Sequence, residues 1–272
     1  MREFVEKDLA IVYQDKLSKN DMPLVRRGEI NPVYYHCNVK SGKLVQGCIS
    51  YLPLDYTGER SAYFTHSLVF TDEECNKLLG DESNTIFNSD VFKTDISEFD
   101  ITSPNASPNN EYPELDYVTK PLNDIQGIYE KYNPETVKNF IGSILFTLCK
   151  KGKPVYFKVD VDDANASKYA LDFICEIMSV LPQPFRQGLS FVTYLNDYTQ
   201  FPSFKLKCVS SKCPEIYQEK GVFFDFKIDL STGLDTGELR NNQLEINFLY
   251  SLLENNDMRI EFLKFITNAI KN

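Results

Sequence analysis

The sequence contains no motif that fixes a reaction, and only two of its 272 residues are histidines. No segment approaches the GxxxxGK[ST] or GxGxxG pattern of a phosphate-binding loop, so we do not expect the chain to hydrolyse nucleotides itself. The longest apolar-rich run, residues 140–149, is far shorter than the roughly 20 residues that a membrane helix needs. The amino-terminal residues 1–15 are charged and lack the apolar centre of a signal peptide. These absences predict a soluble protein without a membrane partner.

The seven cysteines are odd in number, scattered along the chain and never arranged as CxxC. Cys149 and Cys175 fall in apolar helical patterns, where a free thiol behaves as a small hydrophobic group. Cys208 and Cys213 could bind a metal ion, but no second pair or nearby histidine completes a zinc set. We therefore expect reduced thiols, no cofactor and a cytoplasmic location.

The net charge of −10 is concentrated in one part of the sequence. Residues 72–135 hold fifteen acidic and four basic residues, so the remainder is close to neutral. Such a chain lacks the basic footprint of a nucleic-acid-binding protein, and we expect no direct contact with nucleic acid. The acidic segment is either a solvated surface or a face for a basic protein partner.

A hairpin over residues 48–71 organises the first half of the chain, with its turn at residues 57–59. Strict alternation over residues 62–70 places His66 on one face with large apolar side chains. Thr71 and Glu74 then form a capping box, which predicts a helix over residues 72–80. Further strands rich in branched and aromatic residues are predicted at 8–14, 33–37, 85–87 and 91–92.

Apolar helical stripes alternate with short strands in the second half, after a polar segment at residues 101–113 that reads as a loop or linker. The predicted helices are 134–149, 166–181, 242–253 and 257–270, and the predicted strands are 154–160, 188–194, 204–209 and 222–228. The order strand, helix, strand over residues 154–194 predicts a crossover unit with parallel strands. We expect the last two strands to pair with each other as an antiparallel extension.

Together these patterns predict an α/β (α+β) protein with two domains. Residues 1–130 would form a β-rich domain with the central hairpin and the helix at 72–80. Residues 131–272 would form an α/β domain built on the crossover, with an antiparallel extension and carboxyl-terminal helices.

Two groups of residues could carry chemistry. Arg60, Ser61 and His66 could form a site for a phosphorylated or nucleotide substrate, but nothing in the sequence shows that they lie within hydrogen-bond reach of one another. For His66, a core histidine satisfied by one hydrogen bond is the simpler interpretation. For Arg60, a surface ion pair or an inter-domain ion pair is the simpler one.

The second group follows the predicted strand at 154–160. Asp160, Asp162 and Asp163 could bind Mg²⁺ at the carboxyl end of that strand. The alternative is a solvated loop in which the last acid, Asp163, or Asn165 caps the next helix. Arg186, just before the next strand, is either an ion-pair residue at a helix terminus or a contact to a ligand.

Two separated stretches resemble the bacterial GTPase-associated protein family, in its amino-terminal and middle domains. The first is Gly58-Glu-Arg-Ser-Ala-Tyr-Phe-Thr-His-Ser-Leu-Val-Phe70. The second is the apolar helix that ends in Leu181-Pro182, followed by Arg186-Gln-Gly-Leu-Ser-Phe-Val-Thr-Tyr194. A fainter similarity of pattern, over residues 137–194, is to DENN-type modules, which act on small GTPases.

The resemblance implies that the chain works beside a GTPase in a bacterial conflict (defence) system. The leading hypothesis is a non-enzymatic adaptor or regulatory binding module, with Arg60 and Arg186 as candidate contact residues and a GTPase encoded nearby as its partner. The alternatives are an enzyme that uses Arg60, Ser61 and His66, and a structural cytoplasmic protein.

Overall fold

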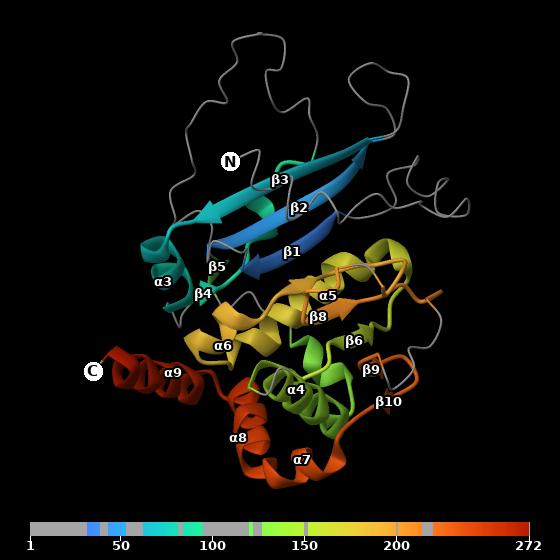
Figure 1. Ribbon diagram of the computed structural model, residues 1–272. Helices are drawn as coiled ribbons and strands as arrows, with labels where there is room; N and C mark the ends of the chain where they lie inside the picture. The colour runs from blue at the N-terminus through green and yellow to red at the C-terminus, as the bar shows by residue number, and fades with distance from the viewer. Residues whose placement is uncertain are drawn as a thin grey trace.

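A computed structural model of the chain describes residues 32–38, 43–52, 62–80, 84–94, 120–121, 127–149, 152–199, 201–213 and 220–271. The predicted strand at 8–14, the turn at 57–59 and the polar segment at 101–113 lie outside these residues. Within them the fold is mixed α/β, as the sequence predicts (Figure 1).

One eight-stranded sheet runs through the described part of the chain, in the order β10-β9-β6-β8-β7-β1-β2-β3. Its strands are β1 (Val33–Asn38), β2 (Leu44–Leu52), β3 (Ala62–Phe70), β6 (Val155–Lys158), β7 (Phe191–Val192), β8 (Leu206–Cys208), β9 (Val222–Asp225) and β10 (Leu230–Thr232). A separate pair is formed by β4 (Asn84–Thr85) and β5 (Lys120–Pro121). Strand β1 pairs with both β2 and β7, so the sheet contains strands from both predicted domains. The division at residues 130 and 131 stays a prediction.

The helices are α3 (Asp72–Gly80), α4 (Pro134–Cys149), α5 (Asp163–Ser179), α6 (Gln183–Gly188), α7 (Thr236–Asn241), α8 (Gln243–Glu254) and α9 (Asn256–Lys271), with short 3-10 helices η1 (Ser89–Val91) and η5 (Ile128–Lys131). Figure 1 shows α7, α8 and α9 gathered at the end of the molecule that lies away from β3. None of the helices in the described ranges has the length and apolar character that crossing a lipid bilayer requires.

Aromatic rings form the centre of the core, between the parallel strands and the helices that cover one face of the sheet. Phe140 of α4 and Phe173 of α5 stack at 5.4 Å between ring centroids, and Phe140 meets Phe157 of β6 edge-on at 5.3 Å. All three side chains are fully buried. The apolar stripes predicted for residues 134–149 and 166–181 therefore provide the buried faces of α4 and α5.

The hairpin strand and the helix after it agree with the sequence prediction. Strand β3 covers residues 62–70, and its Leu68 and Phe70 are buried while Thr65, on the other face, is exposed. The backbone N–H of Glu74 donates to Thr71 Oγ1 at 3.3 Å, and the Thr71 N–H donates to Glu74 Oε2 at 2.8 Å. The capping box is therefore confirmed, and α3 begins where it predicts.

The crossover prediction is confirmed, with one addition. Strands β6 and β7 both pair in parallel with β8, so they run in the same direction with β8 between them. Helix α6 fills part of the connection and shortens the expected strand at 188–194 to β7. Two prolines explain the break. Pro182, the N-cap of α6, prevents α5 from continuing, and Pro184 in the first turn of α6 has the preset backbone angle of a helix start.

Two strand predictions are wrong. Strands β8 and β9 do not pair with each other, because each lies in parallel on one side of β6. The antiparallel extension is instead formed by β9 and β10. Residues 91–92 are not a strand, because the Asn88 side chain accepts a hydrogen bond from the Asp90 N–H at 3.0 Å and starts the 3-10 helix η1.

Candidate functional site

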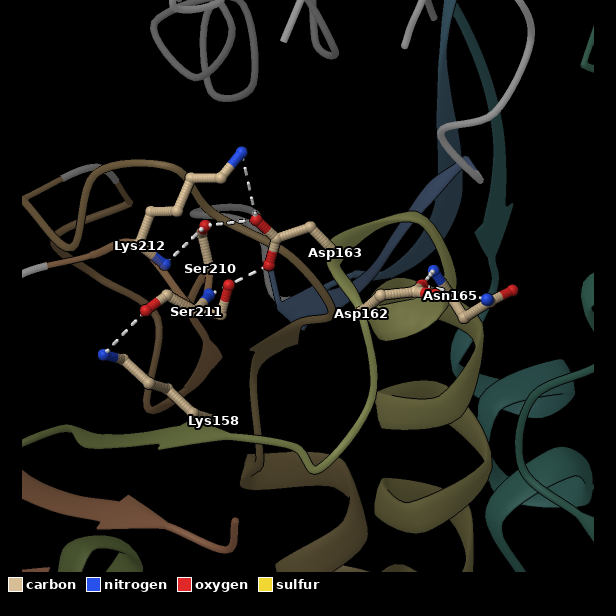
Figure 2. Close-up of polar contacts among 7 residues, drawn as sticks. All are labelled: Lys158, Asp162, Asp163, Asn165, Ser210, Ser211 and Lys212. Carbon is tan, nitrogen blue, oxygen red and sulfur yellow. Dashed lines mark hydrogen bonds and ion pairs between the residues drawn. The ribbon is translucent and has the colours of Figure 1, made fainter. Parts of the chain in front are cut away.

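The carboxyl ends of β6 and β8 meet at one edge of the sheet, where the sequence predicts acidic residues. Figure 2 shows Asp163, in the first turn of α5, facing the loop that follows β8. The Ser210 hydroxyl donates to Asp163 Oδ2 at 2.8 Å, and the Ser211 N–H donates to Oδ1 at 2.9 Å. Lys212 Nζ lies 3.8 Å from Oδ2, with its side chain 59% exposed. Asp163 therefore fixes the loop at residues 209–213 to the start of α5.

The other carboxylates at this edge have separate surroundings. The predicted cap, Asp163 or Asn165, is wrong by one position or more, because Asp162 is the N-cap of α5. Its Oδ1 accepts from the backbone N–H of Asn165 at 3.0 Å and from the Asn165 side chain at 2.9 Å. Asp160 is exposed. No group of three histidine, cysteine, aspartate or glutamate side chains in the described ranges is placed to hold a metal ion. The carboxylates of Asp162 and Asp163 thus serve the cap and the loop, and an Mg²⁺ site at this edge stays a prediction.

Lys158, the last residue of β6, anchors the same loop from below. Its ammonium group donates to the Cys213 carbonyl at 2.7 Å. It also donates to the Ser211 carbonyl at 3.3 Å (Figure 2). The sequence analysis did not single out Lys158, Ser210 or Lys212. The run Ser210-Ser-Lys-Cys directly after a strand was the available signal, but it became meaningful only once β8 was placed beside β6.

Of the predicted catalytic group, Arg60 and Ser61 lie outside the described residues, whereas His66 is described. His66 is half-buried on the face that η1 covers, with its ring 5.7 Å from that of Phe92. Its Nδ1 accepts a hydrogen bond from the Lys93 N–H at 2.9 Å. This is the geometry of a histidine that packs in the fold, and a catalytic role for the three residues stays a prediction.

Arg186 is 1% exposed and donates hydrogen bonds inside the fold. Its Nε donates to the Leu181 carbonyl at 2.6 Å, one terminal nitrogen to the Ser179 carbonyl at 3.2 Å, and the other to the Leu79 carbonyl at 3.4 Å. The guanidinium thus binds carbonyl groups at the ends of α5 and α3, where the helix dipoles favour a positive charge. This geometry supports the helix-terminus interpretation, and the ligand contact stays a prediction.

A buried carboxylate links α5 to the segment before α4. Glu176 is 1% exposed, and its two oxygens accept from the backbone N–H groups of Ile128 at 2.7 Å and Tyr129 at 3.0 Å. Burial raises its pKa from 4.5 to about 7, although both hydrogen bonds favour the charged form. Nearby, Arg259 of α9 donates to the Ser179 hydroxyl at 3.1 Å. The sequence signal for Glu176 was an acidic residue among the buried positions of an apolar helix.

His36 is fully buried and neutral. It stacks on Phe191 at 5.3 Å, and its Nδ1 lies 3.1 Å from the side-chain nitrogen of Gln46. Burial lowers its pKa to about 4. In the parts of the chain that the structure describes, buried polar side chains such as His36, Glu176 and Arg186 therefore contribute to the fold.

Comparison with known protein families gives two matches, in chain order. Residues 9–100 match the model described as GTPase-associated protein 1, N-terminal domain type 2. Residues 126–228 match the model described as GTPase-associated protein 1, middle domain. No curated protein and no solved structure matches the chain. The similarity to DENN-type modules receives no support from these matches.

Proposed function

Because the chain belongs to the GTPase-associated protein 1 family, we propose that it is a non-enzymatic adaptor that binds a GTPase. The single observation that carries the proposal is the match to the amino-terminal and middle domains of this family, in that order. The sequence contains no phosphate-binding loop of its own, so the partner would bind and hydrolyse the nucleotide.

The hydrogen bonds of the buried and half-buried polar groups support binding rather than catalysis. Both oxygens of Asp163 and both oxygens of Glu176 accept hydrogen bonds from groups of the fold. His66 Nδ1 likewise accepts a hydrogen bond from the Lys93 N–H. A substrate would have to compete with these hydrogen bonds of the fold for the same acceptor atoms.

We place this adaptor in a bacterial defence complex in the cytoplasm. The family resemblance is the basis for the defence context. The compartment is supported by the cysteines, since all seven lie in the described part of the chain and none forms a disulfide. Cysteines that form no disulfide, several of them buried, are typical of proteins in a reducing environment.

Affinity purification of the tagged, full-length chain from the cells that encode it tests this proposal. We expect a GTPase to co-purify and to be identified by mass spectrometry. The two purified proteins should then form a complex when mixed, with an affinity that differs between GDP and a non-hydrolysable GTP analogue. Recovery of the chain without any GTPase, under conditions that keep it folded, would contradict the proposal.

A further inference from the structure

Helices α8 and α9 share a line of large apolar side chains on their surface. Phe248 of α8 and Phe262 of α9 meet edge to face, with their ring centroids 4.9 Å apart. Leu244 lies one turn before Phe248, and Phe265 lies one turn after Phe262, so the four residues follow one another across the two helices. We name Leu244, Phe248, Phe262 and Phe265 the α8–α9 stripe.

Three of the four residues of the α8–α9 stripe are exposed to a degree that packing among the described residues does not explain, whereas Phe262 is half-buried. Leu244 is 84% exposed, Phe265 68% and Phe248 40%. They are three of the four exposed large apolar side chains in the described ranges, the fourth being Ile228 near β9. Scattered apolar residues are normal on a surface, but a connected set is typical of an interaction site.

The exposed charges on the two helices that carry the α8–α9 stripe are mostly acidic. Among the residues of α8 and α9 whose side chains the structure describes, the exposed charged ones are Glu245, Glu254, Asp257, Glu261 and Lys264. Four of these five are acidic. In sequence, Glu245 is next to Leu244 and Glu261 is next to Phe262, whereas the one base, Lys264, is next to Phe265. A partner surface that is apolar in the middle and basic at its edges would therefore complement it.

A second copy of the chain does not fit this surface well. A symmetric pair of copies would place the same acidic residues of α8 and α9 opposite each other. The chain also carries a net charge of −10, so two copies repel each other. The charge pattern thus favours a different protein over self-association.

The stripe also lies outside the segments that match the family. Both matched segments end by residue 228, whereas α8 and α9 span residues 243–271. The surface is therefore an addition to the two matched domains.

We propose that the α8–α9 stripe binds a basic amphipathic helix of a partner protein. The apolar face of that helix would cover Leu244, Phe248 and Phe265, and its lysines or arginines would pair with Glu245 and Glu261. The surface is inferred from its own chemistry, and assigning the helix to the GTPase rests on the proposed function.

The first test measures binding of labelled model peptides to the full-length chain by fluorescence anisotropy. The main probe is a leucine–lysine peptide of about 18 residues, which is long enough to form a helix with one apolar face. A second peptide has the same composition in an order that spreads the leucines around the helix, and a third replaces lysine by glutamate. We expect only the first peptide to bind, with an affinity that falls as salt rises.

Surface variants sharpen this test because the chain offers matched controls. The double variant Leu244→Ser/Phe265→Ser should weaken binding about tenfold or more, whereas Ile228→Ser, which removes an exposed apolar side chain elsewhere, should have no effect. Glu245→Lys/Glu261→Lys should also weaken binding, whereas Asp72→Lys/Glu73→Lys in the exposed first turn of α3 makes the same charge change and should not. Equal binding of the reordered peptide, or equal effects of control and test variants, would overturn the inference.

The same variants separate this inference from the proposed function. If a GTPase co-purifies with the wild-type chain but not with Leu244→Ser/Phe265→Ser, both hold. If the GTPase co-purifies equally with both, the adaptor function stands and the stripe is not its docking site. Sedimentation of the purified chain tests self-association. If the wild-type chain is a dimer and this double variant is a monomer, a second copy occupies the surface, and the proposal is overturned.

Discussion

Helix α5 and the α8–α9 pair use polar and apolar side chains in opposite ways. Helix α5 buries Glu176, and its carboxyl-terminal carbonyls receive the buried guanidinium of Arg186. Helices α8 and α9 instead expose Leu244 and Phe265 to solvent. The buried charged side chains of this protein therefore hold the fold together, whereas the exposed apolar side chains of α8 and α9 are accessible to a partner.

The largest effect that would test this comparison is the removal of Arg186. In Arg186→Met the carbonyl groups of Leu181, Ser179 and Leu79 lose their charged donor, and each buried acceptor left unpaired is costly. We expect the free energy of unfolding to fall by about 3 kcal/mol or more, measured by urea denaturation. The exposed Arg240 provides the control, since Arg240→Met should change it by less than about 0.5 kcal/mol. Similar losses in the two variants would contradict a structural role for Arg186.

The raised pKa of Glu176 predicts how the stability of the protein changes with pH. Its pKa in the folded state, about 7, lies above the ordinary value of 4.5, so the folded protein holds this proton more tightly than the unfolded chain. Its contribution to stability is therefore fully present below pH 4.5 and is lost as pH rises through about 7. The size of the loss is roughly 3 kcal/mol.

The variant Glu176→Gln isolates this effect because glutamine does not titrate. We expect the unfolding free energy of the wild type, relative to the variant, to decrease between pH 4.5 and 7 in urea denaturation. A difference that stays constant over this range, or that increases, would show that folding does not raise the pKa of Glu176.

Loss of the helix cap should have a smaller effect. In Asp162→Ala the first turn of α5 loses the side chain that accepts from the Asn165 N–H, which costs about 1 kcal/mol of stability. Asp160→Ala, at an exposed carboxylate two residues earlier, should leave the unfolding midpoint nearly unchanged. An equal decrease in both variants would point to the loss of local charge rather than of the cap.

The smallest effect on stability is expected at the α8–α9 stripe. Phe265→Ser replaces a side chain that is 68% exposed, so the unfolding free energy should change by less than about 0.5 kcal/mol. Thermal unfolding followed by circular dichroism provides the measurement. A loss of 2 kcal/mol or more would mean that Phe265 is part of the core, and the contrast between the two regions would fail.

The sequence predicted where helices and strands lie better than it predicted which strands pair. The alternation over residues 62–70 and the capping box at Thr71 predicted β3 and the start of α3 correctly, because both signals are local. The pairing of β8 and β9 was predicted wrongly, because alternation reports which face is buried and carries no information about the neighbouring strand.

The candidate sites were less predictable, for a similar reason. The acidic run at residues 160–163 was visible in the sequence, but the Ser210 and Ser211 groups that bind Asp163 come from a loop that lies 47 and 48 residues away. The helical spacing over residues 242–270 predicted two helices, yet it did not show that Leu244 and Phe265 stay uncovered. That outcome depends on how α8 packs against α4 and against α9.

Hydrogen–deuterium exchange of the full-length chain, with and without the co-purified GTPase, tests the central claim most directly. The claim is that the buried polar clusters maintain the fold while α8 and α9 receive the partner. We predict that binding slows exchange in residues 243–266 and leaves β3 and the carboxyl ends of β6 and β8 unchanged. Protection centred on residues 62–70 or on the loop at residues 209–213, with none in α8 and α9, would contradict it.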